Sequence, residues 1–154
     1  MAKIKTIATN KKATHEYTIC EKYEAGIALL GTEVKSIRNG KISLQEGWIE
    51  LTADQQAILH QVHISPYTHG NIYNHEPQRS RKLLLSHKQI VKLEKEVQAK
   101  GMTLLPLRVY LKDSLIKIEI ALAKGKKLYD KRQTEKKRTD ERAIQQAMKK
   151  NKSE

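Results

Sequence analysis

The hydrophobic pattern is clearest in two stretches of the C-terminal half, residues 105–111 and 116–122. In each stretch every second residue is aliphatic, and most of the residues between are polar. Because consecutive residues of a β-strand face opposite sides, each stretch predicts a strand with one apolar face and one mostly solvated face. The Lys-Asp-Ser sequence at 112–114 is expected to form the turn of an antiparallel pair.

Further strands are expected in the N-terminal half of the chain. Residues 15–30 are strand-like, with Gly26 marking a bulge or a close approach of another chain segment. Residues 48–51 and 57–64 are expected to be short strands around a polar turn. Residues 65–80 are polar and without periodicity, and such a long connection is typical of functional or mobile loops.

The strongest helix signal covers residues 86–100. An S-x-x-Q capping box opens this segment, apolar residues follow at helical spacing, and Gly101 is a natural stop. A shorter helix is expected over residues 31–40, with Thr32 as N-cap and Asn39-Gly40 as its end. A strand is the alternative for this shorter segment, because it contains β-branched residues.

These elements predict a mainly β fold, a small closed or partly open antiparallel barrel with helices beside it, formed by residues 15–123. Residues 1–14 are polar and basic without a usable period, so we expect a flexible arm. Residues 124–154 contain twelve Lys or Arg against five Asp or Glu, with few apolar residues. We expect this basic tail to be disordered when free and helical where a partner supplies apolar surface.

The charge of the chain indicates a nucleic-acid partner. The net charge is +13, positive in both the body and the tail, and small β-barrels commonly bind RNA on a sheet face. Any single basic residue is ordinarily a solvated surface charge, so the prediction rests on their combination. The basic candidates in the body are Lys35, Arg79, Arg81, Lys82 and Lys117.

Other chemistry has little support in the sequence. The closest histidines, His60, His63, His69 and His75, lack the carboxylate or cysteine spacing of a metal site, and the single Cys20 has no activating neighbour. A Gly-Lys pair near the end of the body lacks the other residues of a P-loop. We therefore expect no enzyme activity, cofactor, metal or small-molecule substrate. Without an apolar leader or a long apolar span, we expect a cytoplasmic protein that does not contact membranes.

Six strings of residues stand in a distinctive order between residues 15 and 132. They are YEAGI (23–27), GTEVKS (31–36), ISPY (64–67), NHEP (74–77), RSRKLLL (79–85) and AKGKKLYDKR (123–132). In this combination and order the chain resembles the SmpB family, the SsrA-binding proteins of bacteria. The resemblance implies an OB-fold-like barrel and a monomeric adaptor of trans-translation. Such an adaptor binds the tRNA-like domain of transfer-messenger RNA and brings it to stalled ribosomes.

The resemblance also implies site residues. The RNA-contacting surface of the family corresponds here to Glu24, Leu84 and Lys117, although Leu84 is equally suited to a core position. The tail is implied to enter the decoding centre and the empty messenger channel, where it folds as a helix. Its motif residues are Gly125, Lys126, Lys127, Tyr129, Asp130, Lys131 and Arg132. The alternative is a structural ribosome-associated protein without a dedicated RNA cargo.

Overall fold

The computed structural model describes residues 3–67 and 74–126, and in these ranges it contains nine strands and three helices. In chain order they are β1 (Ile4–Thr9), α1 (Lys11–Glu16), β2 (Tyr17–Ile27), α2 (Gly31–Arg38), β3 (Ile42–Ser43), β4 (Trp48–Leu51), β5 (Ala57–His60), β6 (His63–Ile64), β7 (Arg81–Leu84), α3 (His87–Lys100), β8 (Thr103–Lys112) and β9 (Leu115–Gly125). Among the described residues, no helix is long and apolar enough to cross a lipid bilayer.

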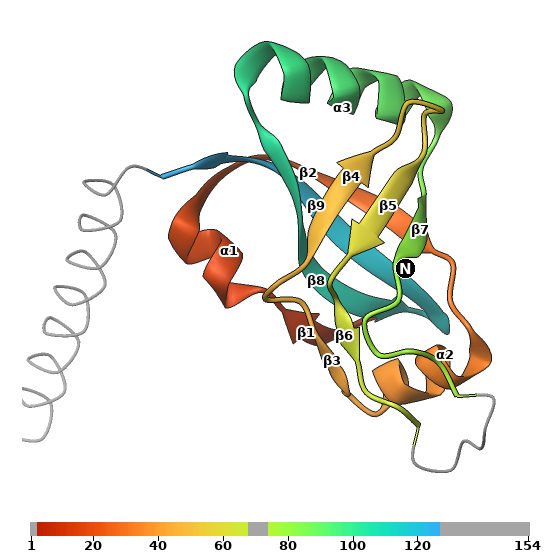
Figure 1. The fold of residues 1–154 in the computed structure, drawn as a ribbon. Coiled ribbons are helices and arrows are strands. Elements are labelled where there is room, and N and C mark those ends of the chain that lie inside the picture. The colour runs from red at the N-terminus through yellow and green to blue at the C-terminus, as the bar shows by residue number, and fades with distance from the viewer. Residues whose placement is uncertain (1–2, 68–73, 127–154) are drawn as a thin grey trace, which may run out of the picture.

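Six strands pair in a closed ring, in the order β8-β4-β5-β7-β2-β9 and back to β8, and β1 is added to β8 (Figure 1). All of these pairings are antiparallel. The shortest strand pairing in the ring joins β4 to β8, through the single residue pair Ile49–Leu104. The predicted mainly β fold with a small OB-like barrel is confirmed.

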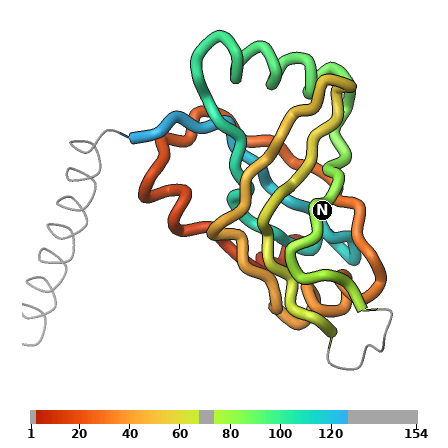
Figure 2. Tube along the Cα trace, in the orientation of Figure 1, coloured from red at the N-terminus to blue at the C-terminus, as the bar shows by residue number. Residues whose placement is uncertain are grey.

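The core fills the inside of this ring. Leu59, Leu83, Ile118 and Ile120 come from β5, β7 and β9, and each is at most 1% exposed. The helices α3 and α2 lie at opposite ends of the barrel, as the tube in Figure 2 also shows. Each helix adds a fully buried aliphatic residue to the same core. Both helices therefore close the barrel, and its outer sheet faces remain available for binding.

The predicted caps of α3 are confirmed. The backbone N–H of Gln89 donates to the Ser86 hydroxyl, and the Gln89 side chain accepts from the backbone N–H of Ser86. Gly101 ends the helix with a φ of 61°, a left-handed conformation in which glycine carries no Cβ penalty.

The helix predicted over residues 31–40 is also present as α2, but its N-cap is Leu30 and not Thr32. The Glu33 carboxylate accepts from the backbone N–H of Leu30 at 2.8 Å, which satisfies one orphan donor at the helix start. The Thr32 hydroxyl is hydrogen-bonded to His75 Nδ1 at 2.9 Å. The capping prediction was therefore wrong because Thr32 is occupied by a tertiary contact.

The prediction of a flexible arm over residues 1–14 is wrong for most of its length. β1 forms an antiparallel pair with β8, and α1 follows at once. Asn10 lies between them, 2% exposed, and its side chain donates to the carbonyls of Leu44 and Pro106 and accepts from the N–H of Ala13. β1 is stabilised by its pairing with β8 and not by a periodic pattern of apolar side chains. The sequence pattern of this segment therefore could not predict the strand.

The prediction of one continuous apolar face on β8 is wrong, because Val109 lies in the main core whereas Leu105 and Leu107 lie in a second cluster. The predicted solvated face of β9 is also partly buried. Leu105, Leu107, Ala121 and Ala123 form a small buried cluster with Ala13 of α1. A register shift in β8 next to Pro106 separates this apolar end from a polar end. One end of the outer face is therefore a minor core under α1, and only the other end is polar.

Candidate nucleic-acid interface

The polar end of the outer sheet face brings together the three residues predicted for RNA contact. Gly26 of β2 pairs with Leu84 of β7 on one side and with Lys117 of β9 on the other. Glu24 lies two residues before Gly26, so it points to the same face of the sheet. Three neighbouring strands thus place Glu24, Leu84 and Lys117 on one surface, which we call the outer row.

Leu84 is a surface residue and not part of the core. Its exposure is 55%, whereas its neighbour Leu83 points inward and is 1% exposed. A Cβ atom added at Gly26 would lie 3.1 Å from Leu84 Cβ, which is closer than ordinary van der Waals contact. The close approach predicted at Gly26 is therefore confirmed, because the exposed Leu84 side chain packs over the bare backbone of Gly26.

Glu24 is held as an ionised hydrogen-bond acceptor. Its half-exposed carboxylate accepts from the Tyr110 hydroxyl and from Lys112 Nζ at 3.2 Å. The hydrogen bond from Tyr110, followed by the contact and charge of Lys112, lowers the pKa of Glu24 below its ordinary value. Lys117 adds a further positive charge to this neighbourhood. Glu24 is therefore ionised at neutral pH.

Tyr110 was not predicted, although it lies at the centre of this network. It is 2% exposed, pairs with Lys117 across β8 and β9, and carries the Arg108 guanidinium 4.6 Å from its ring centroid. Arg108 in turn forms an ion pair with Glu119 at 3.4 Å. Burial, followed by the hydrogen bond to Glu24, raises the pKa of Tyr110, so its hydroxyl remains a donor. The alternating pattern could have identified it, because Tyr110 and Lys117 both fall between the aliphatic residues of the two predicted strands.

The predicted basic residues divide between the surface and the interior. Lys82 is exposed on β7, two residues before Leu84 and on the same face of the sheet. Lys35 of α2 lies with its ammonium 5.4 Å from the ring centroid of Tyr67. Arg79 is 34% exposed and donates to Glu33 at 2.6 Å. Only Lys82 continues the outer row, and Arg79 is largely engaged by Glu33.

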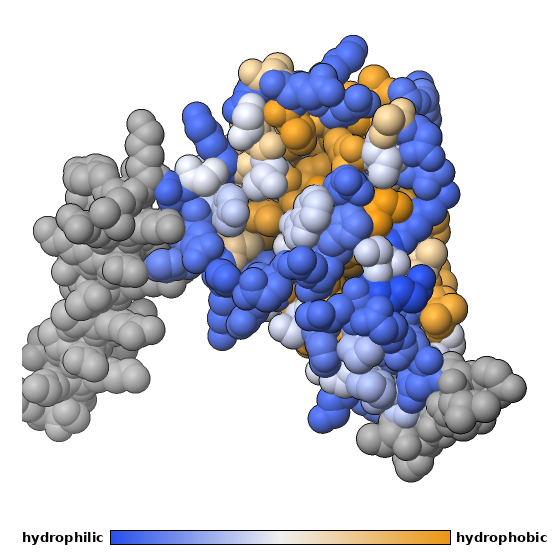
Figure 3. Space-filling model, viewed as in Figure 1, coloured by the Kyte–Doolittle hydropathy of each residue, from blue (hydrophilic) through white to orange (hydrophobic). Residues whose placement is uncertain are grey.

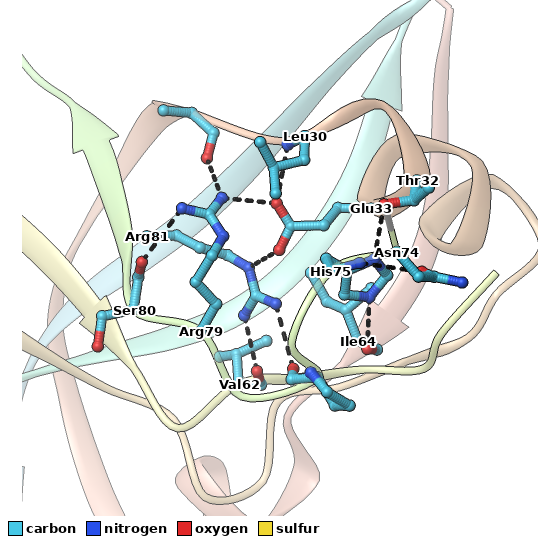
Figure 4. Close-up of polar contacts among 12 residues, drawn as sticks. Leu30, Thr32, Glu33, Val62, Ile64, Asn74, His75, Arg79, Ser80 and Arg81 are labelled. Carbon is cyan, nitrogen blue, oxygen red and sulfur yellow. Dashed lines mark hydrogen bonds and ion pairs between the residues drawn. The ribbon is translucent and has the colours of Figure 1, made fainter. Parts of the chain in front are cut away.

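Arg81 does not belong to an RNA-binding surface. Its side chain is 0% exposed and is held by an ion pair to Glu33 and by hydrogen bonds to the carbonyls of Val62 and Pro77 (Figure 4). Both of its terminal nitrogens and Nε therefore have protein acceptors. The prediction for Arg81 is corrected, because inward alternation on β7 makes it a structural residue.

The Glu33 carboxylate joins α2 to the segment before β7 (Figure 4). Burial acts to raise its pKa, but hydrogen bonds from Arg79, the backbone of Leu30 and Arg81 outweigh burial and hold the pKa below its ordinary value. His75 packs beside it, 5% exposed, and is hydrogen-bonded to Thr32 and to the carbonyl of Ile64. His75 therefore ties the loop to α2.

Acid is expected to weaken the fold through Glu33. Because its pKa is lower in the folded chain than in the unfolded chain, its stabilisation is complete above the unfolded value of about 4.3 and is lost as pH falls through the lower folded value. Chemical denaturation at a series of pH values down to about 3 measures this loss. The Glu33→Gln variant is expected to show a flatter dependence, and an equal slope in both proteins would contradict the assignment.

An apolar groove on another part of the surface has different chemistry. Its volume is about 420 Å³, and it lies between α3 and β4. Apolar side chains gather over the strands below α3 in the view of Figure 3. Trp48, Val97 and Met102 line the groove, and Glu94 is the charged residue at its edge. Among the residues that the structure describes, the groove has no lysine or arginine in its lining, whereas the outer row includes Lys117 and continues to Lys82, so the outer row is the better candidate for RNA.

The tail motif falls mostly outside the described residues. Gly125 pairs with Tyr17 at the end of β9, and the Lys126 N–H donates to the Glu16 carbonyl at 2.9 Å. The predictions for Lys127, Tyr129, Asp130, Lys131 and Arg132, and for a helical tail, lie beyond the part that the structure describes.

A family comparison agrees with this geometry. The model of the SmpB protein family matches residues 7–150. The chain belongs to the SmpB family. The match includes the strands that carry the outer row, the Glu33 contacts and most of the basic tail.

Relatives in the SmpB family match almost the whole chain. The SsrA-binding protein of Pelobacter propionicus is 54% identical over 145 residues, covering 94% of this chain and 95% of the relative. Those of Enterococcus hirae and Gloeothece citriformis are 52% and 55% identical, covering 94% and 96% of this chain and 94% and 95% of their own lengths. A chain of the solved structure "tmRNA-SmpB: a journey to the center of the bacterial ribosome" is 42% identical with a TM-score of 0.66, covering 79% of this chain and 85% of that chain.

Proposed function

We propose that this chain is an RNA-binding adaptor of trans-translation. It binds the tRNA-like domain of transfer-messenger RNA and delivers it to stalled ribosomes. One observation carries the proposal: the outer row places an exposed apolar residue, a basic residue and an ionised acceptor together, on the positions that correspond to the RNA-contacting surface of the SmpB family. Relatives that align with this chain over almost their whole length carry the name SsrA-binding protein, which supports the RNA assignment.

Each member of the outer row has a distinct role in this proposal. Leu84 supplies an apolar platform for an unstacked base. Lys117 neutralises a phosphate, and within the described residues no hydrogen bond or ion pair ties its ammonium elsewhere. Glu24 accepts hydrogen bonds from donor groups of the RNA and repels phosphate. Lys82 extends the positive surface along β7.

The tail holds the ribosome in the same proposal. Residues 127–154, which follow the end of β9 and the anchored Lys126, carry a net charge of +5 and as a helix would span roughly 42 Å. The segment enters the decoding centre and the empty messenger channel, where Tyr129 stacks on a base and the Lys and Arg residues neutralise phosphates. Message in the channel excludes it, so it senses stalling. This role needs no catalytic residue, and we infer that the protein acts in the cytoplasm as a monomer.

Sequencing of co-purified RNA tests the function directly. The full-length protein is expected to enrich one small RNA, the transfer-messenger RNA, over ribosomal RNA. Recovery of ribosomal RNA alone would instead identify a structural ribosome-associated protein without a dedicated cargo. The comparison uses the same preparation washed at two salt concentrations, because electrostatic contacts weaken with salt.

The Lys117→Ala variant is expected to bind the tRNA-like domain more weakly and with a flatter salt dependence. Each lost phosphate contact removes about 0.7 to 0.9 units from the slope of log affinity against log salt. Filter binding or fluorescence anisotropy at several salt concentrations measures that slope. Lys100→Ala, an exposed lysine paired with Glu96 on α3, is the matched control and is expected to change little. Reduced affinity with an unchanged slope would show that Lys117 contacts a base and not a phosphate.

A further inference from the structure

The Glu24 carboxylate has acceptor capacity left over. An ionised carboxylate offers about four lone-pair sites on its two oxygens. The Tyr110 hydroxyl takes a site on Oε2, and Lys112 Nζ lies 3.2 Å from Oε1 and 3.5 Å from Oε2. The contact of Lys112 with Oε2 is at the long limit of a hydrogen bond, so each oxygen has one close donor and keeps one acceptor direction. The Glu24 side chain is 39% exposed. Two neighbouring acceptors face the solvent from a fixed position.

An exposed apolar side chain and a glycine lie close to this carboxylate on the same face of the sheet. Gly26 has no side chain, and Leu84 and Lys117 stand on either side of it. The Leu84 side chain already lies within 3.2 Å of where a Gly26 Cβ would be, so it covers part of that bare backbone. A base lying on Leu84 and Gly26 would have its edge toward Glu24. The phosphate of the same nucleotide would be within reach of Lys117.

We propose that Glu24 recognises the Watson–Crick edge of an unpaired guanine, with Leu84 and Gly26 beneath the base and Tyr110 as the positioning residue for the carboxylate. Guanine presents two adjacent donors on that edge, N1–H and the N2 amino group. Adenine, cytosine and uracil each place an acceptor next to their donor there, so none of them presents two adjacent donors. An anionic pair of acceptors therefore fits guanine and leaves the other bases with an acceptor opposed to an oxygen. This inference rests on the proposed function, since it names the feature of the RNA that the same surface reads.

The surroundings of Glu24 fit a fixed acceptor. On its own strand the site is flanked by the bare Gly26, and β8 contributes Tyr110, Lys112 and Arg108. From β9, Glu119 is the cross-strand neighbour of Glu24, and its charge is matched by Arg108 at 3.4 Å. The buried Tyr110 hydroxyl donates to Oε2 and fixes the orientation of the carboxylate, so the remaining acceptor direction on each oxygen can read the base.

Single-atom changes in the RNA test the proposal. The probe is the tRNA-like domain of transfer-messenger RNA, with each unpaired guanosine replaced in turn by inosine, which lacks the N2 amino group. One such replacement is expected to weaken binding to the full-length protein by about tenfold or more. The Glu24→Gln variant is expected to show a similar loss with the unmodified RNA and no further loss with that inosine. Glu50→Gln is the matched control, because Glu50 is an exposed carboxylate on β4 that pairs with His60 of β5.

The outcomes separate this inference from the proposed function. If the full-length protein binds the domain but no inosine replacement couples to Glu24, the guanine assignment is overturned while the function stands. Loss on removal of a ribose hydroxyl in place of the amino group would overturn it in the same way. If the full-length protein does not bind the domain, both fail.

Tyr110→Phe tests the positioning role. It keeps the aromatic ring and removes the hydroxyl donor to Glu24. We expect weaker binding of the unmodified RNA, a smaller penalty for the critical inosine, and no added effect in the Glu24→Gln background. A loss of affinity that persists in that background would assign Tyr110 a structural role only.

Discussion

Replacing Glu33 by alanine is expected to destabilise the fold by about 3–5 kcal/mol, because it leaves the Arg81 guanidinium buried without a counter-charge. The substitution also removes the acceptor for Arg79 and for the backbone N–H of Leu30 at the start of α2. Chemical denaturation measures the change in the free energy of unfolding. Since native domains have only about 5–15 kcal/mol in total, the variant is expected to be marginally stable.

A matched control and a rescue make this prediction specific. Glu46→Ala removes the carboxylate of an exposed pair with Lys12, and it is expected to change the free energy of unfolding little. Replacing Arg81 by methionine in the Glu33→Ala background removes the uncompensated charge and is expected to recover part of the lost stability. A cost below about 1 kcal/mol for Glu33→Ala, or no recovery in the double variant, would contradict the account of this buried pair.

The main elements could be predicted from sequence wherever a local pattern was sufficient. Strict alternation located β8 and β9, and the capping box with Gly101 fixed both ends of α3. β1 could not be predicted in this way, because its stability comes from hydrogen bonds to β8 and not from its own alternation. The N-cap of α2 was missed because Thr32 is drawn into a contact with His75, which is 43 residues away in the chain.

The candidate site shows the same limit on a smaller scale. Resemblance to the family pointed to Glu24, Leu84 and Lys117, but only the pairing of β7, β2 and β9 shows that they share a face. Sequence could not choose between core and surface for Leu84, since both alternatives satisfy the pattern of a short strand. The same strand misled the interpretation of Arg81, because a basic residue beside two other basic residues looks exposed until its register is known.

The two ends of the proposed adaptor are connected through a well-defined joint. β9 carries Lys117 near its start and ends at Gly125, where it still pairs with Tyr17. The backbone N–H of Lys126 donates to the Glu16 carbonyl, and its Nζ donates to the Thr14 carbonyl. The basic tail thus follows β9, the strand that contributes Lys117 to the outer row. A cut after this joint removes the tail without disturbing the β2–β9 ladder.

A chain that ends after Lys126 is expected to keep its affinity for the tRNA-like domain within about tenfold and to lose peptide tagging of stalled products entirely. The cut removes residues 127–154, which carry a net charge of +5. The affinity that these residues contribute is expected to be non-specific, so the difference in RNA affinity between the two chains is expected to disappear at higher salt. Fluorescence anisotropy measures RNA binding, and a translation reaction on message without a stop codon measures tagging.

A full-length Tyr129→Ala variant is the companion to the truncation, since it preserves the length and charge of the tail. If Tyr129 stacks on a ribosomal base, this variant is expected to lose tagging in part while binding RNA as the parent does. Equal loss of RNA binding and tagging in the truncated chain would contradict the division of labour, because it would place part of the RNA-binding surface in the tail. Retained tagging would contradict it from the other side, since the barrel would then suffice to engage the ribosome.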